Sequence, residues 1–313
     1  MPKQILIATN RKHLSNTELL PKNELRWIGY KVDDSGDKHS YTDFVDKTTS
    51  SDIPECFKKQ IAADKKVLVF VPGARSFESA LNSSFDLQER ISKPVYTSGF
   101  VSKKPLDTTF VGFSMAIEPG RFPEFIQKGW YQDQRRLIED GQSHFHRFLC
   151  DLKATTNKGV DVWGQSAGSI LVRLGTKVKV DNVIISASVL GHDEFDKNGA
   201  ATDLVNNSNR TTVYYARNDR VLKIVERYSG YGSLVGLGGP IDFKDLLPTA
   251  NFVDCRFVNK FDLEDACNHF AYELNETILC DFVNTLRGNE SPVRYKAFPI
   301  NNANQQSWKL HDF

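Results

Sequence analysis

Three side chains far apart in the sequence, Ser166, Asp219 and His269, have the types and the order that nucleophilic catalysis at an acyl group requires. Ser166 lies in "GQSAG" (164–168), directly after an apolar run and directly before an amphipathic helical pattern. A reactive serine projects from a tight strand-to-helix turn, where glycine two residues before and after it avoids collisions. The turn also puts the N–H of Ala167 at a helix start, where it can stabilise a negative oxygen. A glycine-rich turn with Ser166 as a simple helix cap is the alternative.

The acid and the histidine follow the serine in the chain order of doubly wound hydrolases. Asp219 comes after the β-rich run "TTVYYA" (211–216), and His269 comes before the last helical pattern. In these places His269 would take the Ser166 proton and return it to the leaving group, while Asp219 orients the imidazole. Each residue alone is also explained as a helix-start residue, but the ordered trio favours catalysis.

The stretch "KVLVFVPGARSFESA" (66–80) is expected to supply the second oxyanion donor, since that donor follows an early strand in these folds. The backbone N–H of Ala74 is the first candidate and that of Arg75 the second. Gln165, beside the serine, and Phe113 are candidates for substrate contact. The sequence indicates no metal site and no cofactor.

The elements that must position these residues are short β-rich runs that alternate with helical patterns. Several runs are continuously apolar, which is typical of strands buried on both faces of a parallel sheet. The expected strands are 4–9, 26–32, 66–71, 94–99, 160–164, 182–188, 211–216 and 252–258. The expected helices are 77–91, 129–153, a helix that starts at 166, and 270–286. The pattern predicts an α/β fold with a mostly parallel central sheet and helices on both faces.

We expect one domain over residues 1–290 and an irregular C-terminal tail over 291–313. The segment 102–128 interrupts the alternation, because it is rich in aromatic residues and prolines. Long segments without regular structure are often lids or binding loops, so we expect an inserted lid that covers an acyl pocket. A packed surface excursion is the alternative.

Composition excludes several classes of function. The chain of 313 residues is 40% hydrophobic and has a net charge of +1, so no overall field attracts nucleic acid. The five cysteines form no C-x-x-C pair, which argues against a disulfide framework or a zinc knuckle. No apolar run is long enough for a signal peptide core or a transmembrane segment. We therefore expect a protein that is cytoplasmic or is exported by a route without a signal peptide.

The chain resembles the α/β-hydrolase superfamily, and more narrowly a bacterial branch whose members have no assigned function. The resemblance is discontinuous over about residues 4–290 and is carried by "ILIATNRK", "VFVPGARSFESA", "GQSAGS", "YYARNDRVL", "SGYGSLVGLGGP" and "NHFAYE". It implies an α/β-hydrolase fold and a triad of Ser166, Asp219 and His269. Pro72 and Gln165 stand where that branch usually has histidines, and the 102–128 segment is longer than usual.

These observations predict a serine hydrolase that cleaves a carboxylic or lipid ester through an acyl-enzyme, with a small-molecule or lipid ester as its binding partner. A hydrolase fold that binds ligand with little or no catalysis is one alternative, which Pro72 in the oxyanion loop favours. An amidase, peptidase or acyltransferase with the same triad is another, because a fold and a triad do not define a substrate. The sequence indicates neither protein partners nor the oligomeric state.

Overall fold

A computed structural model of the chain describes residues 4–22, 24–32, 41–43, 49–50, 52–61, 65–93, 95–97, 100–103, 106–117, 128–242, 245–258, 267–289, 294–296 and 307–311. Twelve strands of this part form one sheet. They are β1 (Gln4–Thr9), β2 (Leu25–Val32), β3 (Tyr41–Asp43), β4 (Thr49–Ser50), β5 (Lys66–Val71), β8 (Thr108–Ser114), β9 (Val160–Gln165), β10 (Val180–Ser186), β11 (Ser208–Tyr215), β12 (Ala250–Phe257), β13 (Arg294–Lys296) and β14 (Ser307–His311). β6 (Val95–Thr97) and β7 (Phe100–Lys103) form a separate hairpin.

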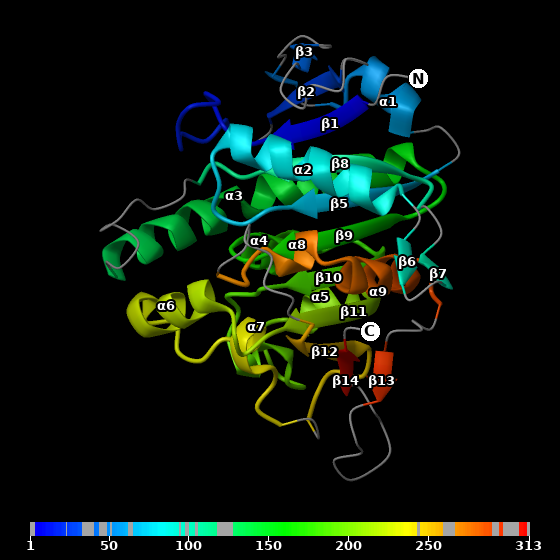
Figure 1. Ribbon diagram of the computed structural model, residues 1–313. Coiled ribbons are helices and arrows are strands. Elements are labelled where there is room, and N and C mark those ends of the chain that lie inside the picture. Colours follow the sequence, from blue (N-terminus) through cyan, green and yellow to red (C-terminus); the bar gives the residue numbers. More distant parts are fainter. Residues whose placement is uncertain are drawn as a thin grey trace.

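The sheet is parallel in its middle. Its order is β13-β14-β12-β11-β10-β9-β5-β8-β1-β2-β3, with β4 paired to β2 (Figure 1). Every neighbouring pair from β1 through β8, β5, β9, β10, β11 and β12 to β14 is parallel. β2 pairs with β1, and β13 with β14, in antiparallel fashion. The loops that follow the parallel strands therefore meet at one edge of the sheet.

Helices cover both faces of this sheet (Figure 1). They are α1 (Glu55–Ile61), α2 (Phe77–Ile91), α3 (Lys128–Thr155), α4 (Gly168–Gly175), α5 (Thr202–Asn206), α6 (Arg220–Ser229), α7 (Val235–Gly238), α8 (Ala271–Leu274) and α9 (Glu276–Leu286), with a short 3₁₀ turn at His192–Phe195. α2 packs with α9 on one side, and α3 packs with α4 on the other. Within the described part of the chain, no helix has the length and apolar character needed to cross a membrane.

The continuous apolar strands explain this two-sided cover. All six residues of β9 are buried, so both faces of that strand need a layer of helix. Toward α9, the Trp163 ring packs edge-on against Phe282, with ring centroids 4.5 Å apart. On the face toward α3, the ring of Phe113 in β8 packs against the rings of Phe145 and Phe148, with centroids 5.0 Å apart in each case. The sheet is mostly parallel with helices on both faces, as the sequence pattern predicted, and its strand order is consistent with the α/β-hydrolase fold that the resemblance implied.

The segment 102–128 differs from its prediction as an inserted lid. Residues 108–114 form β8, a central strand between β5 and β1, and α3 already begins at Lys128. Phe110, Val111 and Phe113 are buried in the core. The lid prediction was therefore wrong for the strand, whose Thr-, Val- and Phe-rich residues were obscured by flanking prolines. Residues 118–127 lie outside the described residues.

The ends of two other elements also differ from the prediction. The C-terminal 291–313 segment is not irregular throughout, because β14 joins β12 in the sheet and β13 pairs with β14. The expected last helix is interrupted at Asn275, whose side chain accepts hydrogen bonds from the N–H groups of Thr277 and Ile278. It caps α9, so the short α8 and α9 are separate helices.

A buried carboxylate lies at the amino-terminal ends of the central strands, at the edge opposite to the loops described below. One oxygen of Asp161 accepts hydrogen bonds from Lys66 Nζ at 2.9 Å and from the side chain and backbone N–H of Asn182 at 2.7 and 3.0 Å. Burial raises the pKa of Asp161 to about 6, although Lys66 and Asn182 act in the opposite direction.

This carboxylate predicts a pH-dependent stability. Because its pKa in the folded state lies above the ordinary value of 3.8, the folded state binds more protons than the unfolded state between about pH 4 and 6. Its contribution to stability is therefore largest below pH 4 and declines as the pH rises through 6. Asp161→Asn should remove this decline. The difference in unfolding free energy between variant and wild type should shift by about 1–3 kcal/mol from pH 4.5 to 7.5 in urea titrations; a constant difference would contradict the assignment.

Candidate active site

Ser166 occupies a strained turn between β9 and α4. Its φ of +51° is in the left-handed region, which a serine rarely adopts. The turn is held by its neighbours, because Ser166 N–H donates to the carbonyl of Ser186 at 2.9 Å and the Ser169 hydroxyl donates to the carbonyl of Ser166 at 2.6 Å. The side chain itself is partly exposed. The turn therefore presents a hydroxyl at the carboxyl edge of the sheet.

Three glycines lie near this serine, and each is packed so closely against neighbouring atoms that a side chain would not fit. A Cβ added at Gly164 would lie 2.8 Å from Val172 Cγ2, and one added at Gly168 would lie 2.2 Å from the carbonyl oxygen of Val71. A Cβ at Gly73 would lie 2.8 Å from the Cβ and 3.1 Å from the Oγ of Ser166. Real Cβ atoms do not tolerate separations this short, so the expected steric role of Gly164 and Gly168 is confirmed. The loop after β5 therefore lies directly against Ser166.

Gly168→Ala tests this close packing. The new methyl group meets the backbone oxygen of Val71, so the loop after β5 must move or the helix must shift. We expect a loss of about 2–4 kcal/mol in the free energy of unfolding, measured by urea titration. Gly129→Ala is the matched control, because a Cβ there has nothing within 4 Å and alanine favours the helix. Equal stabilities of the two variants would contradict the described packing.

Residues with a strained backbone conformation lie at the carboxyl edge of the sheet. Among the described residues, the non-glycine positions with positive φ are Ser166, Ala187 and Asn268. Ser166 and Ala187 directly follow β9 and β10, and Asn268 lies in the loop that leads from β12 to α8. Strained backbone concentrates at functional sites, where the surrounding structure compensates for it. These strained positions therefore indicate that the candidate functional site lies at the carboxyl edge of the sheet.

The His269 ring and the Asp219 carboxylate form a buried pair at the same edge. Asp219 is fully buried before α6, and His269 is 5% exposed before α8. His269 Nδ1 lies 2.8 Å from Asp219 Oδ2. The other oxygen, Oδ1, accepts the N–H of Leu222 at 2.9 Å and so caps α6. Because both carboxylate oxygens are engaged, the orientation of the acid is fixed, and it holds the imidazole by one nitrogen.

Arg75 links the Ser166 turn to the His269 segment. Its Nη2 donates to Gln165 Oε1 at 3.2 Å and to Glu273 Oε1 at 2.6 Å. Gln165 directly precedes Ser166, and Glu273 of α8 lies four residues after His269. Glu273 is also close enough to His269 for the two to interact electrostatically. The side chains of Arg75, Gln165 and Glu273 therefore form one cluster between the serine turn and the segment that carries His269.

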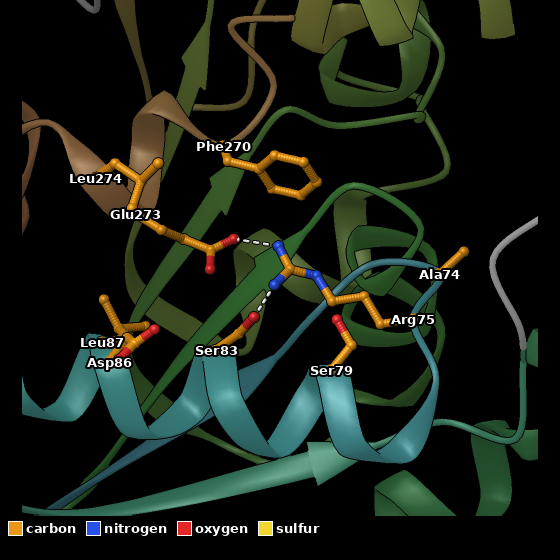
Figure 2. A pocket seen from close by; sticks show the side chains of 9 residues that line it. All are labelled: Ala74, Arg75, Ser79, Ser83, Asp86, Leu87, Phe270, Glu273 and Leu274. Atoms are coloured by element: carbon orange, nitrogen blue, oxygen red, sulfur yellow. Dashed lines mark hydrogen bonds and ion pairs between the residues drawn. The ribbon is translucent and has the colours of Figure 1, made fainter. Parts of the chain in front are cut away.

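A cavity of about 420 Å³ opens beside this cluster (Figure 2). Its wall on α2 carries polar groups, and Phe270 and Leu274 face them from the segment that follows His269. Its lining consists of Ala74, Arg75, Ser79, Ser83, Asp86, Leu87, Phe270, Glu273 and Leu274. Ala74 and Phe270 are the direct neighbours of Gly73 and His269, so the cavity borders the candidate site without including Ser166.

Two of the expected substrate contacts need correction. Phe113 is fully buried between β8 and α3, so its side chain belongs to the core and does not reach the site. Gln165 is also fully buried, and it accepts a hydrogen bond from Arg75, so it supports the turn from within. Arg75, expected only as a backbone donor, contributes its side chain to the same contacts. Ala167 directly follows Ser166 in the chain, and Ala74 follows Gly73, which lies against Ser166, while the role of both as donors stays a prediction.

Sequence reasoning missed Arg11, which is fully buried. Its guanidinium donates to the backbone carbonyls of Asn16 and Arg75, each at 2.9 Å, and to that of Ile117. The hydrogen bond from Arg11 to the Arg75 carbonyl holds the backbone of the loop after β5 in place. An arginine two residues after an apolar strand was the available signal, because a buried charge in that position needs buried partners.

Comparisons with known proteins give only distant similarity. A lipase-esterase related protein from Clostridium acetobutylicum ATCC 824 is 11% identical, with a TM-score of 0.31; the match covers 70% of this chain and 93% of that chain. A structure of esterase B from Lactobacillus rhamnosis with a tributyrin phosphonate is 10% identical, with a TM-score of 0.27, covering 73% and 80%. No protein-family model and no curated protein matches the chain. The assignment of fold therefore comes from the sheet order described above.

Proposed function

We propose that the protein is a serine hydrolase that cleaves carboxylic esters through an acyl-enzyme. The proposal rests on two features of one sheet edge, which are a serine in a strained strand-to-helix turn and a buried histidine–aspartate pair. The turn follows β9, the acid follows β11 and the histidine follows β12, and these strands run parallel. Their carboxyl ends therefore lie at the same edge of the sheet, which supports the proposed roles of the three residues in a Ser-His-Asp triad.

The proposed reaction has two halves. In the first, Ser166 Oγ attacks the ester carbonyl carbon while His269 takes the hydroxyl proton, and the tetrahedral intermediate then expels the alcohol, which receives that proton. In the second half, His269 removes a proton from water, the resulting hydroxide equivalent attacks the acyl-enzyme, and the acid leaves Ser166 with its proton restored. Asp219 holds Nδ1 of the imidazole throughout and stabilises its positive charge.

The oxyanion of each intermediate needs preorganised donors. Ala167 directly follows the serine and precedes the first residue of α4, so its N–H is the first proposed donor. Ala74 follows Gly73, which lies against Ser166, so its N–H is the second. The N–H of Arg75 is the next candidate along the loop. Pro72 does not remove a donor from these positions, which weakens the argument for an inactive protein.

The cavity next to Ala74 and Phe270 is the proposed site for one part of the ester. Its apolar wall of Phe270, Leu274 and Leu87 suits a short or medium acyl chain, and its polar wall favours a group with hydrogen-bonding capacity. We expect p-nitrophenyl esters of two to eight acyl carbons to be cleaved faster than the palmitate ester.

A panel of p-nitrophenyl esters, assayed beside the p-nitroanilides of the same acids, tests the proposed function. We expect saturable ester hydrolysis, at least about 100-fold slower anilide hydrolysis, and complete inhibition by one equivalent of a p-nitrophenyl phosphonate. Anilides cleaved as fast as esters would indicate an amidase. An inert protein that takes up no phosphonate would contradict the proposal and would favour a binding protein.

A further inference from the structure

Arg75 and Glu273 form a buried ion pair between segments that lie far apart in the sequence. Arg75 Nη2 and Glu273 Oε1 are 2.6 Å apart, and the side chains are 11% and 8% exposed. Arg75 belongs to the loop between β5 and α2, and Glu273 belongs to α8. Figure 2 shows the Arg75 guanidinium between Glu273 and Ser83, with the Phe270 ring also next to it. The pair therefore joins the loop beside Ser166 to the helix after His269.

The guanidinium also contacts the direct neighbours of both proposed reactive side chains. It donates to Gln165, the residue before Ser166, at 3.2 Å. Its central carbon lies 4.7 Å from the centroid of Phe270, the residue after His269. The Phe270 ring in turn packs edge-on against the His269 ring, with centroids 5.3 Å apart. One planar group thus defines the separation between the serine turn and the histidine segment.

The energetics of the pair favour a geometric role over a stabilising one. Burial raises the pKa of Glu273, and the charge of Arg75 and its hydrogen bond oppose that rise. Desolvation offsets most of the Coulomb attraction in a buried pair, so packed apolar side chains would stabilise the fold about as well. The guanidinium differs from apolar groups in its rigid fork, which sets the direction of several hydrogen bonds at once.

We propose that Arg75 and Glu273 are positioning residues for the hydrolysis, holding the Ser166 turn and the His269 ring at their working separation. The inference rests on the proposed function. Arg11 completes the arrangement by binding the carbonyl of Arg75, so the loop is fixed through both its backbone and its side chain. Arg75 and Glu273 act through Gln165, Phe270 and the electrostatic environment of His269.

The test compares Arg75→Lys, Glu273→Gln and the double variant Arg75→Gln/Glu273→Gln with wild type, using p-nitrophenyl butyrate. Arg90→Gln is the matched control, since Arg90 also joins α2 to the α8–α9 segment, through the Leu274 carbonyl at 3.0 Å and Glu276 at 3.5 Å. We expect each pair variant to lower kcat about 10- to 100-fold and, because both side chains also line the cavity, to change KM by a smaller factor. The control should change neither by more than about 2-fold. Arg75→Lys keeps the positive charge but lacks the planar fork of hydrogen-bond donors. Its kcat should therefore be about as low as that of the other pair variants.

The pH profile supplies a readout that a merely structural role would not move. Among the described residues, Asp219 is hydrogen-bonded to the His269 ring, Glu273 interacts with it electrostatically, and Arg75 is paired with Glu273. Glu273→Gln leaves the guanidinium without its carboxylate, which disfavours a protonated imidazole. Because His269 must be neutral to take the Ser166 proton, kcat/KM is expected to rise with pH. This rise should shift to lower pH in Glu273→Gln and return toward wild type in the double variant.

Nuclear magnetic resonance titration of the His269 ring compares wild type with the pair variants and needs no substrate. It therefore tests the role of Arg75 and Glu273 independently of the proposed ester hydrolysis. If wild type cleaves no ester, the proposed function is wrong, while a shifted His269 titration in Glu273→Gln would still support the action of the pair on that ring. If wild type is active, unchanged kcat and titration curves in the pair variants overturn the inference, even if their melting temperatures fall. The uncharged double variant keeps the test available should a single variant fail to fold.

Discussion

Ser166→Ala is expected to lower kcat for p-nitrophenyl butyrate by about 10⁴-fold or more, because it removes the oxygen that forms the acyl-enzyme. The fold should tolerate the change. Ser166 is partly exposed, alanine keeps the Cβ that packs against Gly73, and a φ of +51° strains alanine about as much as serine. Steady-state kinetics and thermal unfolding measure the two effects separately.

Ser233→Ala is the matched control for this substitution. Ser233 is exposed, and its backbone carbonyl, which accepts the N–H of His192, remains in the variant. We expect wild-type kinetics from the control. A Ser166→Ala protein that keeps more than a tenth of wild-type kcat, once contaminating esterase is excluded, would remove Ser166 from the mechanism.

Asp219→Asn is expected to lower kcat by about 10³- to 10⁴-fold with little loss of stability. The amide oxygen can replace Oδ1 as acceptor for the Leu222 N–H, which preserves the cap of α6. The amide NH₂ then faces His269 Nδ1, where Oδ2 lies 2.8 Å away in the wild type. An NH₂ group there makes Nδ1 an acceptor and moves the ring proton to Nε2, the nitrogen that must take the Ser166 proton.

Asp203→Asn is a suitable control for the loss of one carboxylate, because Asp203 is exposed in the first turn of α5. It should leave kcat within about 2-fold of wild type. Circular dichroism and urea titration establish whether Asp219→Asn is folded. A folded Asp219→Asn protein with near wild-type kcat would show that His269 does not depend on this carboxylate.

The central elements of the fold could be predicted because local pattern and tertiary context agree there. The expected bounds of β5 and α2 match the structure, since an apolar run buried on both faces and a capped amphipathic helix are unambiguous patterns. β8 was missed because its identity as a central strand depends on its partners β1 and β5, which are distant in the sequence. β14 was missed for the same reason.

The site could be predicted in part. A reactive serine has a local signature in its glycines, and the acid and histidine follow it in a known order, so the sequence can propose these three residues. The structure adds the strained turn of Ser166 and the His269–Asp219 hydrogen bond. The contacts among Arg75, Gln165 and Glu273 were not, because they join three positions without any shared local pattern. Burial decided the roles of Gln165 and Phe113, and only the folded chain reveals that burial.

The most direct test of the proposed site is a crystal structure of the protein after reaction with a p-nitrophenyl butylphosphonate ester, which releases p-nitrophenolate as its phosphorus binds the nucleophile. We expect a covalent bond from phosphorus to Ser166 Oγ and a phosphoryl oxygen within hydrogen-bond distance of the N–H groups of Ala74 and Ala167. His269 Nε2 should lie beside Ser166 Oγ. A phosphonate bound to another residue, or an unmodified Ser166 after prolonged incubation, would contradict it.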